Sequence, residues 1–218
     1  LQSANAQFSN SLFFNRNAKV FSAEYSWLQQ ENKMLLASGY DARSQTKHQL
    51  NLRLNISTKF ALETTLLQAQ NAAFADYTNG RNFQIAQQEL KPQLIYQEGS
   101  LLRLSVAGSL SQKNNSVLYG GQSAKSKSLE TTWKINQSEK GSFNGALKYV
   151  YFDFNGTALS AVGYEMLEGL RPGTNWTWNL SYQKILGKNL QLSLNYGGRL
   201  MQGQTAVHTG GMELRAYF

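Results

Sequence analysis

The sequence predicts an all-β chain of long antiparallel strands, and three observations support that prediction. Apolar and polar residues alternate without interruption in many segments, as in Leu190-Gln-Leu-Ser-Leu-Asn-Tyr196, which is the period of a strand with two different faces. Aromatic residues make up 12% of the chain and Pro occurs only 2 times, a composition that suits strands. The segments are mostly 10 to 15 residues long, whereas strands in soluble proteins average roughly 5 to 6 residues.

Composition excludes several classes of function. The 218 residues include 20 Gln, 19 Asn and no Cys, and charged residues make up only 16% of them, against roughly 25% in average soluble domains. The lack of Cys removes disulfides, thiolate metal sites and Cys nucleophiles, and His48 and His208 are the only histidines. Glu165 and Glu168 are paired carboxylates, but they lie in a loop flanked by Gly and Pro. We therefore expect no cofactor, no metal site and no enzymatic activity.

Twelve strands are predicted, and five show the clearest alternation. The fourth is predicted from Leu50-Asn-Leu-Arg-Leu-Asn-Ile56, the seventh from Leu102-Arg-Leu-Ser-Val106 and the eighth from Leu129-Glu-Thr-Thr-Trp-Lys-Ile135. The tenth and eleventh follow from Trp176-Thr-Trp-Asn-Leu-Ser-Tyr182 and Leu190–Tyr196. The full set, in chain order, is 6–15, 19–29, 33–42, 47–57, 59–70, 83–97, 100–112, 124–137, 141–154, 174–185, 189–200 and 206–218.

The predicted connections are of two lengths. Long connections are expected at 71–82, 113–123 and 155–173, and they all fall at one end of the strands, so both chain ends should lie at the other end. If Ala161 to Leu167 formed a further strand, the count would be thirteen and a partner strand would be needed, giving fourteen. The short turns are predicted at Gln30-Glu31-Asn32, Ser57-Thr58, Glu98-Gly99, Ser138-Glu139-Lys140 and Gly187-Lys188.

Two environments produce this alternation. In a soluble sandwich or lipocalin-like barrel the apolar face points inward, whereas in an outer-membrane barrel it faces lipid and the polar face lines the lumen. Strand length favours the membrane, because a tilted membrane strand needs about 9 to 11 residues. The predicted fold is therefore a transmembrane antiparallel up-and-down β-barrel of about twelve strands, with residues 1–218 forming a single domain.

The polar positions carry a mixture of acids and bases, which a narrow lumen requires because unpaired charges in a confined space are costly. The alternative is that they are ordinary solvated side chains. The charges predicted to face the lumen are Glu24, Arg53, Glu63, Glu89, Lys91, Arg103, Glu130, Lys134, Lys148, Arg199, Glu213 and Arg215.

Aromatic residues near strand ends are predicted to lie at the two membrane interfaces, although a sandwich core would also use aromatics. The predicted interface aromatics are Tyr25, Trp27, Trp133, Trp176, Trp178, Tyr182, Tyr196 and Phe218. The net charge of +8 comes from bases near turns and strand ends. We expect these bases to contact anionic lipid headgroups, including lipopolysaccharide. They do not cluster with aromatics as in a nucleic-acid-binding surface.

The chain ends on an aromatic residue after an alternating segment, Gly211-Met-Glu-Leu-Arg-Ala-Tyr-Phe218. This resembles the carboxy-terminal strand of Gram-negative outer-membrane β-barrels, although Ala216 is smaller than that pattern favours. Together with Tyr164–Trp178, the closing Val207–Phe218 is similar to the ends of large surface-associated proteins of Bacteroidota. The resemblance implies a large amino-terminal portion, and Leu1–Gln7 shows no signal-peptide pattern, which fits either a removed leader or the terminal barrel of a longer chain.

Three functions are compatible with such a barrel in the outer membrane of a Gram-negative bacterium. The preferred one is a membrane anchor or subunit of a larger cell-envelope or surface assembly, whose partners would be membrane lipids and other envelope proteins. The alternative is a pore for small solutes. A twelve-stranded outer-membrane phospholipase is disfavoured, because neither His48 nor His208 lies in a Ser-His pattern on one strand.

Overall fold

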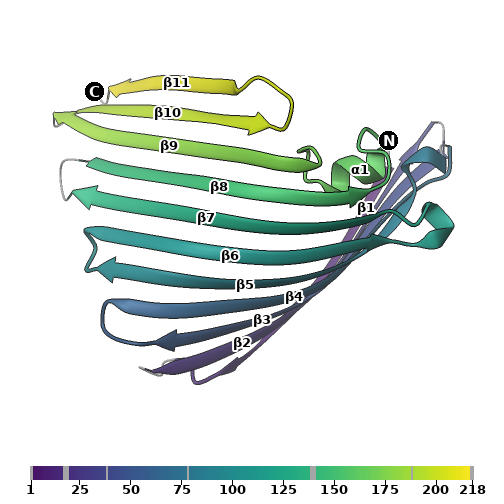
Figure 1. Cartoon of the computed structure of the whole chain (residues 1–218), viewed down its shortest axis with the longest axis horizontal. Helices are drawn as coiled ribbons and strands as arrows, with labels where there is room; N and C mark the ends of the chain where they lie inside the picture. Colours follow the sequence, from purple (N-terminus) through teal and green to yellow (C-terminus); the bar gives the residue numbers. More distant parts are fainter. Residues whose placement is uncertain are drawn as a thin grey trace.

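The computed structural model describes residues 2–16, 20–37, 39–77, 79–137, 141–187 and 189–216. They form one antiparallel sheet of eleven strands, in which each strand pairs with its neighbours in sequence (Figure 1). The strands are β1 (Gln2–Phe14), β2 (Phe21–Leu36), β3 (Gly39–Asn55), β4 (Phe60–Ala75), β5 (Phe83–Glu98), β6 (Leu102–Asn115), β7 (Ser123–Gln137), β8 (Gly141–Asn155), β9 (Gly173–Gly187), β10 (Leu190–Met201) and β11 (Val207–Ala216).

The first quarter of the chain corrects the predicted strand boundaries. The three segments predicted at 19–29, 33–42 and 47–57 form only two strands, β2 and β3. The predicted turn Gln30-Glu31-Asn32 lies inside β2, where Glu31 pairs with both Ala6 and Ser44. The chain instead reverses after Leu36 and enters β3 at Gly39, whose φ of 133° suits glycine. Consecutive polar residues did not end this strand, because β1 and β3 on its two sides continue the backbone ladder past them.

Because the sheet has eleven strands and not the twelve predicted, one chain end lies at the opposite end of the sheet from its predicted position. Since the strands alternate in direction, β1 and β11 run the same way. The first and last strands therefore begin at the same end of the sheet, and the N- and C-termini lie at opposite ends (Figure 1). The prediction that both termini lie beside the short turns was wrong for the N-terminus.

The long connections lie at one end of the sheet, as predicted. They are residues 76–82, 116–122 and 156–172, and each joins a strand that arrives at that end to the next that leaves it. Two carry short 3-10 helices, η1 (Asn79–Arg81) and η2 (Val117–Tyr119). At the other end, Ser57-Thr58 and Gly99 lie in short connections as expected. The predicted turn at 138–140 and Lys188 lie outside the described residues.

The 156–172 connection is neither a strand nor a simple surface loop. It contains α1 (Ala161–Met166), which begins at Ser160, whose Oγ accepts a hydrogen bond from the Gly163 N–H at 2.9 Å. Met166 and Leu167, at the end of this helix, are fully buried. They pack against side chains of the sheet that include Ile85, Ala124, Val150 and Phe152. This contact between the connection and one face of the sheet forms the apolar core among the described residues.

The other face of the sheet has large apolar side chains, and no described residue packs over them. Leu66, Leu90 and Leu110 lie directly opposite one another across β4, β5 and β6, and all three are exposed, Leu110 to 54%. A soluble sandwich would pack such a row into its centre. Helices contribute no membrane crossing, because none of those described is both long and apolar enough. Leu66, Leu90 and Leu110 thus form an apolar row that the described residues leave exposed.

Candidate functional site: the polar face beneath the inward-folded connection

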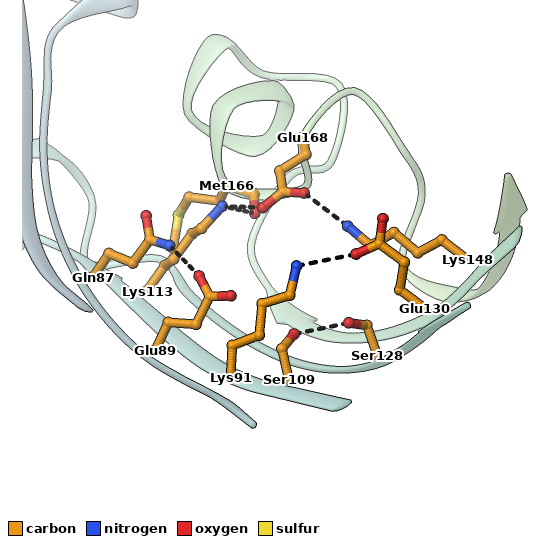
Figure 2. Close-up of polar contacts among 10 residues, drawn as sticks. All are labelled: Gln87, Glu89, Lys91, Ser109, Lys113, Ser128, Glu130, Lys148, Met166 and Glu168. Atoms are coloured by element: carbon orange, nitrogen blue, oxygen red, sulfur yellow. Dashed lines mark hydrogen bonds and ion pairs between the residues drawn. The ribbon is translucent and has the colours of Figure 1, made fainter. Parts of the chain in front are cut away.

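The two faces of the sheet follow from strand register. Residues directly opposite each other on antiparallel strands share a face, and Arg53, Glu63 and Gln93 are opposite one another across β3, β4 and β5. The same row continues through Ala107 and Glu130 to Lys148 on β8. Figure 2 shows that the curved sheet presents this face toward α1. We call it the polar face, and the leucine-rich side the apolar face.

Strand register and alternation place every charge that was predicted to face the lumen on the polar face. Glu24 pairs with Asn51, and Arg103 pairs with Lys134. At the far side of the sheet, Arg199 pairs with Thr177 and Glu213 pairs with Ser193. The remaining members of the set are Arg53, Glu63, Glu89, Lys91, Glu130, Lys148 and Arg215.

Some of these charges meet and others do not. The Arg53 Nη1 to Glu63 Oε1 distance is 2.6 Å, and the Lys91 Nζ to Glu130 Oε2 distance is 3.0 Å. On β11, the Arg215 Nε to Glu213 Oε1 distance is 2.7 Å. The remaining predicted charges are Glu24, Glu89, Arg103, Lys134, Lys148 and Arg199. Among the described residues, no ion pair within 4.0 Å joins any two of these six.

The centre of the site is an ion-paired contact between the sheet and the 156–172 connection. Lys113 of β6 is 8% exposed, and its Nζ donates to Glu168 Oε1 at 2.9 Å and to the Met166 carbonyl at 3.2 Å. Lys148 of β8 lies on the other side of the same carboxylate, with its Nζ 3.7 Å from Glu168 Oε2. One carboxylate of the connection therefore bridges two lysines of the sheet (Figure 2).

A second layer of polar contacts lies on the sheet around this bridge. Lys91 donates to Glu130, and the Gln87 amide donates to Glu89 Oε2 at 3.2 Å. The Ser109 and Ser128 hydroxyls are 2.8 Å apart. Figure 2 shows these side chains rising from β5, β6 and β7 toward α1. The polar face thus carries several separate polar contacts beside the Glu168 bridge.

The bridge controls the ionisation of Glu168. Burial raises the pKa of this carboxyl, but the charges and hydrogen bonds of Lys113 and then Lys148 lower it by more. The net result is a pKa below the ordinary value for Glu, so the carboxylate stays ionised at neutral pH. Two cations and one anion leave the cluster with excess positive charge.

Sequence reasoning missed both ends of this contact. Lys113 was assigned to the connection at 113–123, but β6 extends to Asn115. The signal was present, because Ser109, Ser111 and Lys113 continue the alternation of the polar face. Glu168 was interpreted as a loop residue without a role, and no pattern within 155–173 indicated that the segment folds against the sheet.

The predicted interface aromatics lie on the apolar face. Register places Tyr25, Trp27, Trp133, Trp176, Trp178, Tyr182 and Tyr196 there, whereas Phe218 lies outside the described residues. Trp27 does not close its strand as expected, because β2 continues to Leu36.

The two histidines have the same surroundings on this face. The Tyr25 hydroxyl is 2.8 Å from His48 Nδ1, and the Tyr196 hydroxyl is 2.8 Å from His208 Nδ1. Trp27 stacks on His48 with ring centroids 6.2 Å apart. Both histidines thus pack among aromatic side chains, on the face of the sheet opposite the charged bridge.

Comparison with known proteins gives a structural likeness alone. No family profile matches the chain, and no curated protein matches it either. Among solved structures, it is similar to OmpT, an outer membrane protein of Vibrio cholerae folded in vitro and described in its trimer form. The TM-score is 0.55 at 9% sequence identity, covering 99% of this chain and 99% of that one. The all-β, up-and-down topology and this likeness show that the chain has the fold of an outer-membrane β-barrel.

Proposed function

We propose that this chain is an integral outer-membrane β-barrel that serves as a membrane anchor or subunit of a larger envelope or surface assembly. The observation that carries the proposal is the 156–172 connection, which folds onto the polar face and is fixed there by buried Met166 and Leu167 and by the Glu168 bridge. A connection fixed in this way fills part of the lumen at the long-connection end. A filled lumen suits an anchor better than an open channel.

The membrane location rests on the apolar face. A groove of about 910 Å³ crosses it from β2 to β8, and its apolar lining includes Leu50, Leu66 and Leu90. Lys125 and Lys127 line the same groove near the long-connection end. Acyl chains beside leucines and anionic headgroups beside lysines are the contacts expected of membrane lipids and lipopolysaccharide. The outer membrane of a Gram-negative bacterium is the location that follows from this proposal.

Conductance in planar bilayers tests the anchor. We expect the purified protein to give no stable single-channel steps. Deletion of residues 157–170 should create conductance, because it removes α1 and the Glu168 bridge together. The matched control is deletion of residues 117–121, a connection at the same end that carries η2, and it should leave the bilayer silent.

A pore for small solutes is the second candidate, and the charged polar face favours it. Lys91, Lys113 and Lys148 project from the strands toward the lumen, against Glu89 and Glu130. A conducting lumen with this lining would select for anions. Reproducible steps from the intact protein, with an anion preference that Lys91→Glu reverses, would establish the pore and overturn the anchor.

A further inference from the structure

Both outer strands of the sheet have an edge without a partner. Among the described residues, β1 pairs only with β2 and β11 pairs only with β10. Every residue of these two strands is exposed. Hydrocarbon offers no hydrogen bonds to backbone amides, so spanning sheets are closed. The edges of β1 and β11 must therefore be paired in the membrane.

The edge of β1 does not resemble one that is meant to remain free. Soluble proteins protect edge strands with charges, Pro or bulges, but the 13 residues of β1, Gln2–Phe14, include no charged residue, Pro or Gly. The strand keeps the alternation of a barrel wall. Leu12 lies opposite Tyr25 on the apolar face, and Ser11 lies opposite Ser26 on the polar face. The edge is thus suited to continuing the sheet.

Strand direction decides which strands can be added at the two edges of the sheet. With eleven alternating strands, β1 and β11 are parallel to each other, so direct closure would place one parallel pair in an antiparallel sheet. Parallel pairing is slightly less stable per residue, and bacterial single-chain barrels have even strand numbers.

A second copy does not change this result. Copies that share one membrane orientation present the same strand directions, so β1 of one would again lie parallel to β11 of the other. An antiparallel pair of β1 strands would require one copy to be inverted. Inversion would place its 156–172 connection on the opposite side of the membrane.

We propose that the barrel is completed by an odd number of further strands, contributed by polypeptide outside the 218 residues, which join the edges of β1 and β11 in antiparallel pairing. The neighbouring strands indicate the chemistry of these added strands. Their lipid face would continue the apolar surface of Leu12 and of Met212, which is 75% exposed. Their lumen face would be uncharged and polar beside Ser9 and Ser11. This proposal rests on the proposed membrane location and is independent of whether the lumen conducts.

Site-specific photo-crosslinking in the native gene product, expressed in its own cells, tests the closure. A photoreactive residue at Ser9 on β1 and another at Thr209 on β11 should each link to peptides outside residues 1–218. The linked peptides should alternate between apolar and polar residues. Ser128, in the middle of β7, is the control and should link only within the sheet. Links between β1 and β11, within one chain or between copies, would overturn the proposal, as would links from one edge alone.

Engineered cysteine pairs give a second measurement, because the chain has no native Cys. Ser11 and Ser26 lie directly opposite each other, so S11C/S26C should form a disulfide under mild oxidation. S9C combined in turn with T209C, G211C or E213C should form none, since at least one strand separates them. Efficient oxidation of any of these three pairs would show direct closure. A protein found outside the membrane would refute the proposed function, whereas these pairs report on the edges alone.

Discussion

The two faces of this sheet differ in what covers them. On the polar face, α1 and the residues around it bury Met166 and Leu167 and enclose Lys113. On the apolar face, leucines such as Leu90 and Leu110 stand exposed in rows. A soluble protein has the opposite arrangement, with leucines covered and lysines in water. In the proposed membrane setting, the sheet therefore has two separate sources of stability, which are lipid on the apolar face and its own 156–172 connection on the polar face.

The largest expected effect comes from placing a charge on the apolar face. Leu90→Arg, near the middle of β5, should destabilise the folded barrel by about 2–4 kcal/mol, the cost of Arg facing lipid at the bilayer midplane. Denaturant unfolding in lipid vesicles measures this change. Gln93→Arg is the matched control on the same strand, because Gln93 lies on the polar face opposite Glu63. Equal destabilisation by both variants would contradict the assignment of the faces.

Truncating the apolar anchor of the connection should have the next largest effect. Leu167→Ala removes a fully buried side chain and should destabilise the attachment of the connection by roughly 2–3 kcal/mol, toward the low end for buried Leu→Ala changes. Amide hydrogen exchange over residues 156–172 is the measurement, since β1 to β7 should keep their protection. Leu159→Ala is the control because Leu159 is 90% exposed, and comparable exchange in both variants would argue against the packing described.

Removing the bridging carboxylate should have a smaller effect on the same segment. Glu168→Gln leaves Lys113 buried without its anion, which should loosen the connection by about 1–3 kcal/mol. Proteolysis of the folded protein within 156–172 reports the change. Glu165→Gln is the matched control, because among the described residues the ion pairs of Lys113 and Lys148 are made with Glu168 and not with Glu165. Faster cleavage in the control than in Glu168→Gln would refute the bridge.

Acidification should also loosen the 156–172 connection, more weakly than Glu168→Gln and reversibly. The pKa of Glu168 is lowered in the folded state, so its contribution is fully present above the ordinary Glu pKa and is lost as pH falls through the lowered value. The protection factors of the amides in the connection, which correct for the intrinsic pH dependence of exchange, should therefore fall as pH drops below the ordinary Glu pKa and stay constant between pH 6 and 8. Glu168→Gln should abolish this acid-dependent step, and a step that survives in the variant would assign it to another group.

The amino-acid sequence predicted those features that depend on residues one or two positions apart. Alternation in segments such as Leu50–Ile56 placed the charges on one face and the leucines on the other, and residue types favouring turns gave the common end of the long connections. The turn at Gln30-Glu31-Asn32 was wrong because a polar run is compatible with a strand whenever its neighbours continue the ladder. Glu31 has such neighbours in Ala6 and Ser44.

The two different faces of the sheet follow from residue order alone, because side chains on a strand alternate between faces whatever the strand pairs with. The position of the 156–172 connection, the sharing of Glu168 by Lys113 and Lys148, and the odd number of strands among the described residues follow only from the folded arrangement. Each of them joins residues that lie far apart along the chain. Lys113 and Glu168 are 55 residues apart, and the attraction between them exists only after the sheet has curved and the connection has folded back onto it.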